Sequence, residues 1–132
     1  MNYFSGNQES KNSALYFKAQ EIMQISRRIS DYLTPDLAVL SENGTEDKRI
    51  YFTGDIVRNS HSLILNINKA ETEFFQDTRM QYVASVSRLT ERLYKSCERL
   101  EYVSSNGKDF LLILRKEIQK FRKLQRIWRL SL

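Results

Sequence analysis

Apolar residues recur every three or four positions along much of the chain, the spacing of one face of an α-helix. A first segment, about residues 12–34, repeats through Leu15, Ala19, Ile22, Ile25, Ile29 and either Tyr32 or Leu33. A segment at about 77–104 keeps a near-heptad rhythm through Tyr82 or Val83, Val86, Leu89, Leu93, Cys97, Leu100 and Val103. The last segment, about 108–131, steps through Leu111, Leu114, Ile118, Phe121, Gln125 and Trp128. These patterns predict three amphipathic helices.

A further helix is predicted between the first and third segments, at about 46–70, although its rhythm is less regular. Its recurring positions are Ile50, Thr53, Val57, Ile64 and Ile67. Gly54 interrupts this segment, either to let a neighbouring helix approach or as a merely tolerated residue. In the connection that follows, Glu73-Phe74-Phe75 is expected to dock as a hydrophobic staple beside the third helix.

Glycine and proline mark the predicted breaks. Pro35 should weaken the first helix, because the residue before a proline is pushed away from helical geometry. The stretches 41–45 and 104–107 contain Asn-Gly and predict loops. Four helices with short connections predict an all-α fold, an up-down-up-down antiparallel four-helix bundle. We expect one domain over residues 11–132, after a flexible N-terminal tail at 1–10.

Charge is distributed unevenly along the chain, whose formal net charge is +5. Residues 108–132 contain eight Lys and Arg against two acidic residues, a local charge of +6. In the third segment, by contrast, Glu91, Glu98 and Glu101 lie at helical spacing beside Arg88, Arg92, Lys95 and Arg99, and we interpret these as surface ion pairs. The positive excess is therefore predicted to belong to the last helix alone.

Residues that carry chemistry are scarce. His61 is the only histidine, and Cys97, the only cysteine, falls on a core position, so neither a Cys–His dyad nor a zinc site is supported. Phosphate-binding glycine loops are missing, so we predict no enzyme, no metal and no cofactor. The longest apolar run, Phe110–Leu114, is too short to span a bilayer, and the polar N-terminus is no secretory signal. A cytoplasmic protein is expected.

Advancing about 100° per residue along the last helix separates an apolar stripe from a broad basic face. The stripe contains Leu111, Leu114, Ile118, Phe121 and Trp128. The candidate site residues are the cations around the rest of the helix, Arg115, Arg122, Arg126 and Arg129 in one row and Lys116, Lys120 and Lys123 farther round. A row of guanidinium groups suits the phosphates of RNA or DNA, contacting the backbone without reading sequence.

Three other interpretations of this basic face compete with nucleic-acid binding. It could be an ordinary solvated face paired with acids on neighbouring helices, or a scaffold surface that binds an acidic protein partner. A membrane-surface helix needs the same apolar stripe that closes the bundle, so we expect no membrane binding. Four apolar residues lie off the stripe and predict a homo-oligomer that covers them: Leu112, Ile113, Ile127 and Leu130.

The pattern of four long helices in a small basic chain, with Tyr32-Leu33-Thr34-Pro35 closing the first helix, resembles the accessory variability determinant (Avd) proteins of diversity-generating retroelements. The ribosomal-RNA intervening-sequence proteins are similar in architecture. The resemblance covers about residues 12–130 at the level of helix pattern. It implies a barrel-like pentamer that binds RNA or DNA and partners a reverse transcriptase. The combined hypothesis is a non-catalytic, oligomeric nucleic-acid-binding accessory protein.

Overall fold

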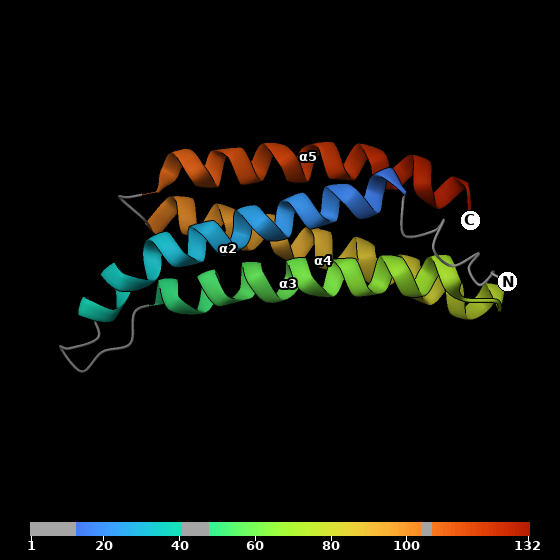
Figure 1. Ribbon diagram of the computed structural model, residues 1–132, viewed down its shortest axis with the longest axis horizontal. Helices are drawn as coiled ribbons and strands as arrows, with labels where there is room; N and C mark the ends of the chain where they lie inside the picture. The colour runs from blue at the N-terminus through green and yellow to red at the C-terminus, as the bar shows by residue number, and fades with distance from the viewer. Residues whose placement is uncertain (1–12, 41–47, 104–106) are drawn as a thin grey trace, which may run out of the picture.

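The computed structural model describes residues 13–40, 48–103 and 107–132, and the side chains of 13–33, 52–102 and 107–132. Four α-helices account for nearly all of them: α2 (Ala14–Leu40), α3 (Lys48–Thr72), α4 (Gln76–Val103) and α5 (Lys108–Leu130) (Figure 1). No strand occurs in these three ranges. The predicted all-helical class and the four helices are confirmed.

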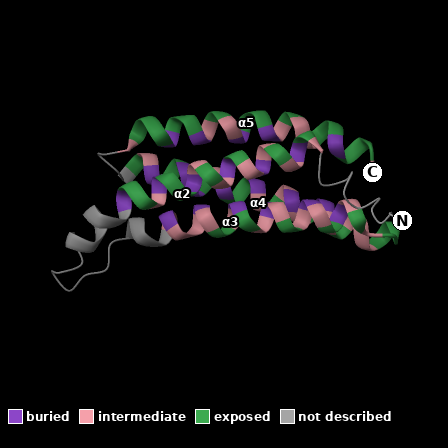
Figure 2. Ribbon diagram, viewed as in Figure 1, coloured by how far each residue is buried: buried purple, intermediate pink, exposed green. Residues whose placement is uncertain are grey.

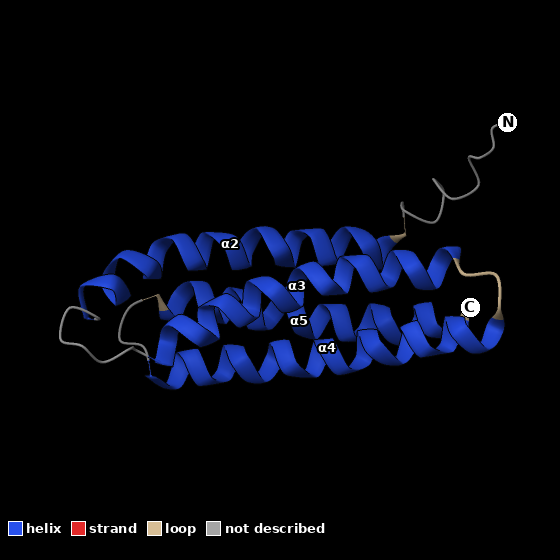
Figure 3. Cartoon of the chain, turned by 90° about the horizontal axis from the view of Figure 1, so that it is seen from below, coloured by secondary structure: helices blue, strands red, loops and turns tan. Residues whose placement is uncertain are grey.

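The helices lie side by side as one elongated bundle (Figures 1 and 3). Contacts join α2 to α3, α3 to α4, α4 to α5, and α5 back to α2, so each helix has two neighbours. Across the α4–α5 contact, Arg115 meets Glu101 and Gln125 meets Ser87. As the residue number on α5 increases from 115 to 125, the number of its contact residue on α4 decreases from 101 to 87. α4 and α5 are therefore antiparallel. In this ring α2 is the helix diagonal to α4.

Every helix buries one stripe (Figure 2). Its members alternate by three and four residues, the spacing of coiled-coil seams, except for one step of seven on α5 between Phe121 and Trp128. The stripe of α2 contains Leu15, Ala19, Ile22, Ser26, Ile29 and Leu33. That of α3 contains Thr53, Ile56, Ser60, Leu63, Ile67 and Ala70. That of α4 contains Val83, Val86, Thr90, Leu93, Cys97 and Leu100. On α5 the buried residues are the five predicted ones, Leu111, Leu114, Ile118, Phe121 and Trp128.

The predicted core positions of α3 are partly wrong. Ile56 and Leu63 are fully buried, whereas Val57 and Ile64 are only partly buried. The reason is Ser60, which occupies the core position between Ile56 and Leu63 and interrupts the apolar rhythm that sequence analysis follows. Because serine is a polar residue, a serine at a core position makes it difficult to recognise from the sequence which residues of α3 are buried.

Ser60 is accommodated by a second buried serine, Ser26 on α2. The two hydroxyl oxygens lie 2.9 Å apart, and Ser60 Oγ also donates to the Ile56 carbonyl at 2.6 Å. Ser26 Oγ therefore has Ser60 Oγ as its acceptor. Because buried polar groups are costly without partners, this pair fixes the relative position of α2 and α3 within an otherwise apolar core.

Two predictions about helix ends are wrong. α2 does not stop near Thr34 but continues to Leu40 and passes through Pro35. A proline within a helix removes a single backbone donor, and the remaining hydrogen bonds of α2 carry it past that position. Phe74 and Phe75 do not form a staple, since they are 84% and 67% exposed and pack edge-to-face on each other, with ring centroids 5.4 Å apart.

The two glycines among the described residues, Gly54 and Gly107, differ in their structural role. The atoms nearest to a Cβ built at Gly54 belong to the Arg58 guanidinium of the same helix, with Nη1 at 3.0 Å, and not to a neighbouring helix. Gly107, just before α5, has φ 77°, in the left-handed region that favours glycine. The predicted tail at 1–10, the loop at 41–45 and residues 104–106 lie outside the described residues.

The serine pair gives a test of the core. Ser60→Ala should lower the free energy of unfolding by about 1–3 kcal/mol, because it leaves the buried Ser26 hydroxyl without its partner. The double variant Ser26→Ala/Ser60→Ala should be more stable than Ser60→Ala, since no unsatisfied hydroxyl remains. Urea denaturation of the wild type, both single variants and the double variant measures this. Additive losses would show that the two hydroxyls are not coupled.

Candidate nucleic-acid interface

The direction in which the basic side chains of α5 point is fixed by the packing of its buried stripe. At its C-terminal end Trp128 is buried, and its Nε1 donates to Glu71 of α3 at 2.9 Å. With the stripe held in the core, the seven predicted site cations point toward α4, toward α2 or outward. They divide into three that meet carboxylates and four that do not, among the described residues.

Two arginines of the predicted row are bound by glutamates of α4. Arg115 Nε lies 2.9 Å from Glu101 Oε2, and its Nη2 donates to Oε1 at 3.1 Å. Hydrogen bonding to Glu101 raises the pKa of the Arg115 guanidinium. Arg122 Nη2 donates to both carboxylate oxygens of Glu91, at 2.9 and 3.0 Å. At Arg115 and Arg122 the predicted row is therefore paired with acids of a neighbouring helix.

Arg122 is held on a second side by an aromatic ring. Its guanidinium carbon lies 4.1 Å from the centroid of the Tyr94 ring, which is cation–π distance. Glu91 and Tyr94 occupy the face of α4 that packs toward α5. A phosphate could reach the Arg122 guanidinium only in competition with the Glu91 carboxylate. Arg122 thus serves mainly to join α5 to α4.

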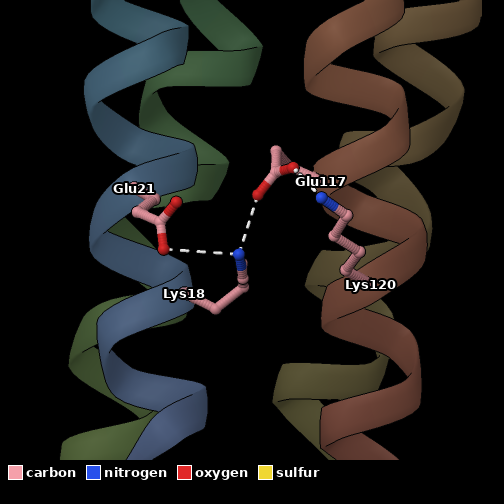
Figure 4. A network of polar contacts seen from close by, with 4 residues as sticks. All are labelled: Lys18, Glu21, Glu117 and Lys120. Carbon is pink, nitrogen blue, oxygen red and sulfur yellow. Dashed lines mark hydrogen bonds and ion pairs between the residues drawn. The ribbon is translucent and has the colours of Figure 1, made fainter.

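Lys120 belongs to a third cluster, between α5 and α2 (Figure 4). Lys18 Nζ lies between Glu117 and Glu21, at 2.8 and 3.3 Å, while Lys120 Nζ lies 2.9 Å from the other oxygen of Glu117. The hydrogen bond from Lys18 lowers the pKa of the Glu117 carboxyl. Hydrogen bonding to Glu117 likewise raises the pKa of Lys18. This network fastens α5 to α2.

Four of the seven predicted site cations are exposed and have no carboxylate within ion-pair distance in the described part of the chain: Lys116, Lys123, Arg126 and Arg129. Arg126 and Arg129 line a groove of about 240 Å³ between α4 and α5. Its other walls are Ser87, Thr90, Glu91, Arg122 and Gln125. The groove combines the Arg126 and Arg129 guanidinium groups with the Glu91–Arg122 ion pair, two hydroxyl groups and an amide. Its cations outnumber its single carboxylate, which suits a phosphate.

Apolar side chains interrupt the same outer face of α5. Ile113 is 49% exposed, Ile127 68% and Leu130 85%. The prediction that these residues lie off the buried stripe is confirmed, as it is for Leu112. A surface of mixed apolar and cationic character is therefore presented along the length of α5.

The predicted ion pairs within α4 do not form. Glu91 and Glu101 turn to α5 instead. Arg92 and Lys95 are left with no hydrogen bond or carboxylate partner among the described residues, and Arg88 binds only the Ser85 hydroxyl. In the sequence Glu91 is three residues from Arg88 and four from Lys95, so the spacing alone does not predict that it pairs with α5 instead.

The two residues considered for chemistry, Cys97 and His61, differ in exposure. Cys97 is buried and its Sγ donates to the Leu111 carbonyl at 3.3 Å. Burial raises the pKa of the Cys97 thiol to about 12, which keeps it protonated. His61 is exposed on α3. No group of three His, Cys, Asp or Glu that could hold a metal occurs among the described residues.

Comparison of the chain with protein-family models, with curated proteins and with solved structures finds no match. Among the described helices, none combines the length and the apolar character needed to cross a membrane.

The Glu117 network predicts a pH-dependent contribution to stability. Glu117→Gln should lower the free energy of unfolding at pH 7 by about 1–3 kcal/mol, because Lys18 loses a charged acceptor. Since folding lowers the pKa of Glu117 below its ordinary 4.5, its contribution is present above that value and is lost as the pH falls through the folded-state pKa. Denaturation curves at pH 7 and pH 3 measure the difference.

The control for this variant is Glu21→Gln, which removes an acid that is 55% exposed from the same lysine. It should have a much smaller effect at both pH values. Equal losses for the two variants, or a loss at Glu117 that does not shrink in acid, would contradict the assigned role of Glu117.

Proposed function

We propose that this chain is a non-catalytic nucleic-acid-binding accessory protein that contacts the phosphate backbone of RNA or DNA. One observation carries the proposal: four exposed cations of α5, Lys116, Lys123, Arg126 and Arg129, lack carboxylate partners among the described residues. Unpaired Lys and Arg side chains bind phosphates and release counterions. Lys120, Arg115 and Arg122, which carboxylates already bind, become secondary contacts.

We further infer an up-down-up-down antiparallel bundle that assembles as a homo-oligomer. The course of the chain in Figure 1 and the antiparallel α4–α5 pairs support the alternating directions. The exposed Ile113, Ile127 and Leu130 on α5 support the oligomer. Repetition of the α5 cations in every subunit would give one particle several phosphate-binding faces, which increases affinity by multivalency.

The resemblance to Avd proteins supplies the proposed context, a pentamer that partners a reverse transcriptase. It rests on the helix pattern and on Tyr32-Leu33-Thr34-Pro35. Co-purification with a reverse transcriptase encoded beside this chain tests the partner separately from nucleic-acid binding.

A second candidate function is a scaffold whose basic face meets an acidic protein. The mixture of exposed apolar and cationic side chains on α5 favours it, because protein interfaces combine both. A scaffold predicts binding to an acidic protein with indifference to RNA and DNA. The salt dependence of nucleic-acid binding therefore separates the two functions.

The α5 surface gives the first test of nucleic-acid binding. Affinity for a fluorescein-labelled single-stranded RNA of 24 nucleotides is measured by anisotropy at several salt concentrations. The slope of log affinity against log salt should be several units for the wild type and smaller by about 1.4 for Arg126→Gln/Arg129→Gln, at about 0.7 per phosphate contact. The same titration with duplex DNA shows which nucleic acid is preferred.

A matched control removes two exposed arginines from α2, the helix diagonal to α4, as Arg27→Gln/Arg28→Gln. This variant has the same net charge as the α5 variant and should keep the wild-type slope. A wild type that fails to bind at low salt would contradict the proposed function. Equal losses in the control and the α5 variant would show that only net charge matters.

The apolar face of α5 predicts the oligomeric state. Light scattering should give the wild type a mass several times that of one chain, and Ile113→Lys/Ile127→Lys should reduce it, because burying two lysines in an interface is costly. Leu65→Lys/Phe74→Lys, which replaces exposed apolar residues on α3 and beyond its end, is the control and should keep the wild-type mass. A monomeric wild type would contradict the oligomer.

A further inference from the structure

A second unneutralised cationic surface follows the outer face of α4. We call it the α4 stripe, and it consists of Arg88, Arg92, Lys95 and Arg99. These residues step by four, three and four positions, so they lie on one helical face over about 16 Å at 1.5 Å per residue. All four are exposed.

The acids of α4 do not neutralise this stripe. Glu91 and Glu101 are instead bound by Arg122 and Arg115 of α5. Glu98 shares a surface hollow with Glu101 and Arg115, and therefore also lies toward α5. α4 is thus divided lengthwise into a side whose glutamates lie toward α5 and a basic side that faces solvent and α3.

Polar groups of α3 complete a groove beside the stripe. A hollow of about 290 Å³ between α3 and α4 is lined by Asp55, Asn59, Arg92, Lys95, Ser96 and Arg99. Its one carboxylate, Asp55, is paired with Arg58 from the following turn of the same helix. Arg99 extends over the Phe52 ring of α3, with its guanidinium carbon 5.8 Å from the centroid. The groove therefore offers three cations, an amide and a hydroxyl.

Four like charges on one helical face repel one another, and this repulsion destabilises the helix when no ligand is bound. Like-charged pairs three and four residues apart destabilise a helix by about 0.2–0.5 kcal/mol each. Among the described residues no carboxylate pairs with a stripe cation, and the contacts there are neutral ones, Arg88 with Ser85 and Arg99 with Phe52. Arg115 and Arg122 of α5, by contrast, are matched by glutamates. Bound polyanion would offset it, because each phosphate neutralises a cation and releases counterions.

We propose that the α4 stripe and the adjoining α3–α4 groove form a second phosphate-binding surface, on which the nucleic acid held by α5 continues across α4. The inference rests on the proposed function and extends it to a surface outside the basic last helix. Arg92, Lys95 and Arg99 contact backbone phosphates, while Asn59 and Ser96 add hydrogen bonds. A chain with two such surfaces covers a longer stretch of nucleic acid than α5 alone.

The test measures binding of the same 24-nucleotide RNA to four proteins at several salt concentrations. They are the wild type, Arg92→Gln/Lys95→Gln, Arg126→Gln/Arg129→Gln and the combined variant, with Arg27→Gln/Arg28→Gln as the charge-matched control. Arg92→Gln/Lys95→Gln should lower the salt slope by about 1.4, and the combined variant by about 2.8. Circular dichroism melting checks that each variant is folded, as expected for exposed positions.

The outcomes separate this inference from the function on which it rests. If the α5 variant loses slope while Arg92→Gln/Lys95→Gln behaves as the control, the second surface is refuted and α5 alone binds nucleic acid. If both double variants lose slope and the losses add, both surfaces are supported. A wild type that does not bind refutes both. Displacement of the RNA by poly-glutamate of equal charge, at equal concentration, would assign the stripe to an acidic protein and overturn the proposal.

Discussion

The ion pairs between α4 and α5 determine where positive charge is left exposed on this bundle. Glu101 and Glu91 of α4 bind Arg115 and Arg122 of α5, and each pairing removes one cation from the basic face of α5. It also removes one anion from the neighbourhood of the α4 stripe. Because these contacts neutralise Arg115 and Arg122, the cations that remain without carboxylate partners among the described residues lie elsewhere on α5 and along the α4 stripe.

The core imposes this distribution of charge. Alternating steps of three and four residues place one stripe of each helix inside, and the rotation of the helix then fixes the direction of every other side chain. Ser26 and Ser60 meet within this core at 2.9 Å. Outside it, Lys18 and Glu117 join α2 to α5, while Trp128 and Glu71 join α5 to α3. Polar contacts of this kind set the relative positions of helices whose apolar faces could otherwise slide.

Much of the fold could be predicted from the sequence, because apolar periodicity reports directly on burial. All five buried residues of α5 followed from a helical wheel, whereas on α3 the serine at position 60 displaced the predicted register. The candidate site was harder to predict, since a wheel shows which residues share a face of one helix but not what faces them. Glu91 could pair with Arg88 or Lys95 on its own helix or with Arg122 on the next, and only packing selects Arg122.

The account depends most on the claim that paired and unpaired arginines have different roles. The direct measurement is a ¹⁵N correlation spectrum of the arginine Nε–H groups, recorded while single-stranded RNA is added. We expect the signals of Arg92, Arg99, Arg126 and Arg129 to shift, and those of Arg115 and Arg122 to stay near their starting positions. Shifts confined to Arg115 and Arg122, or no shifts at any arginine, would contradict the account.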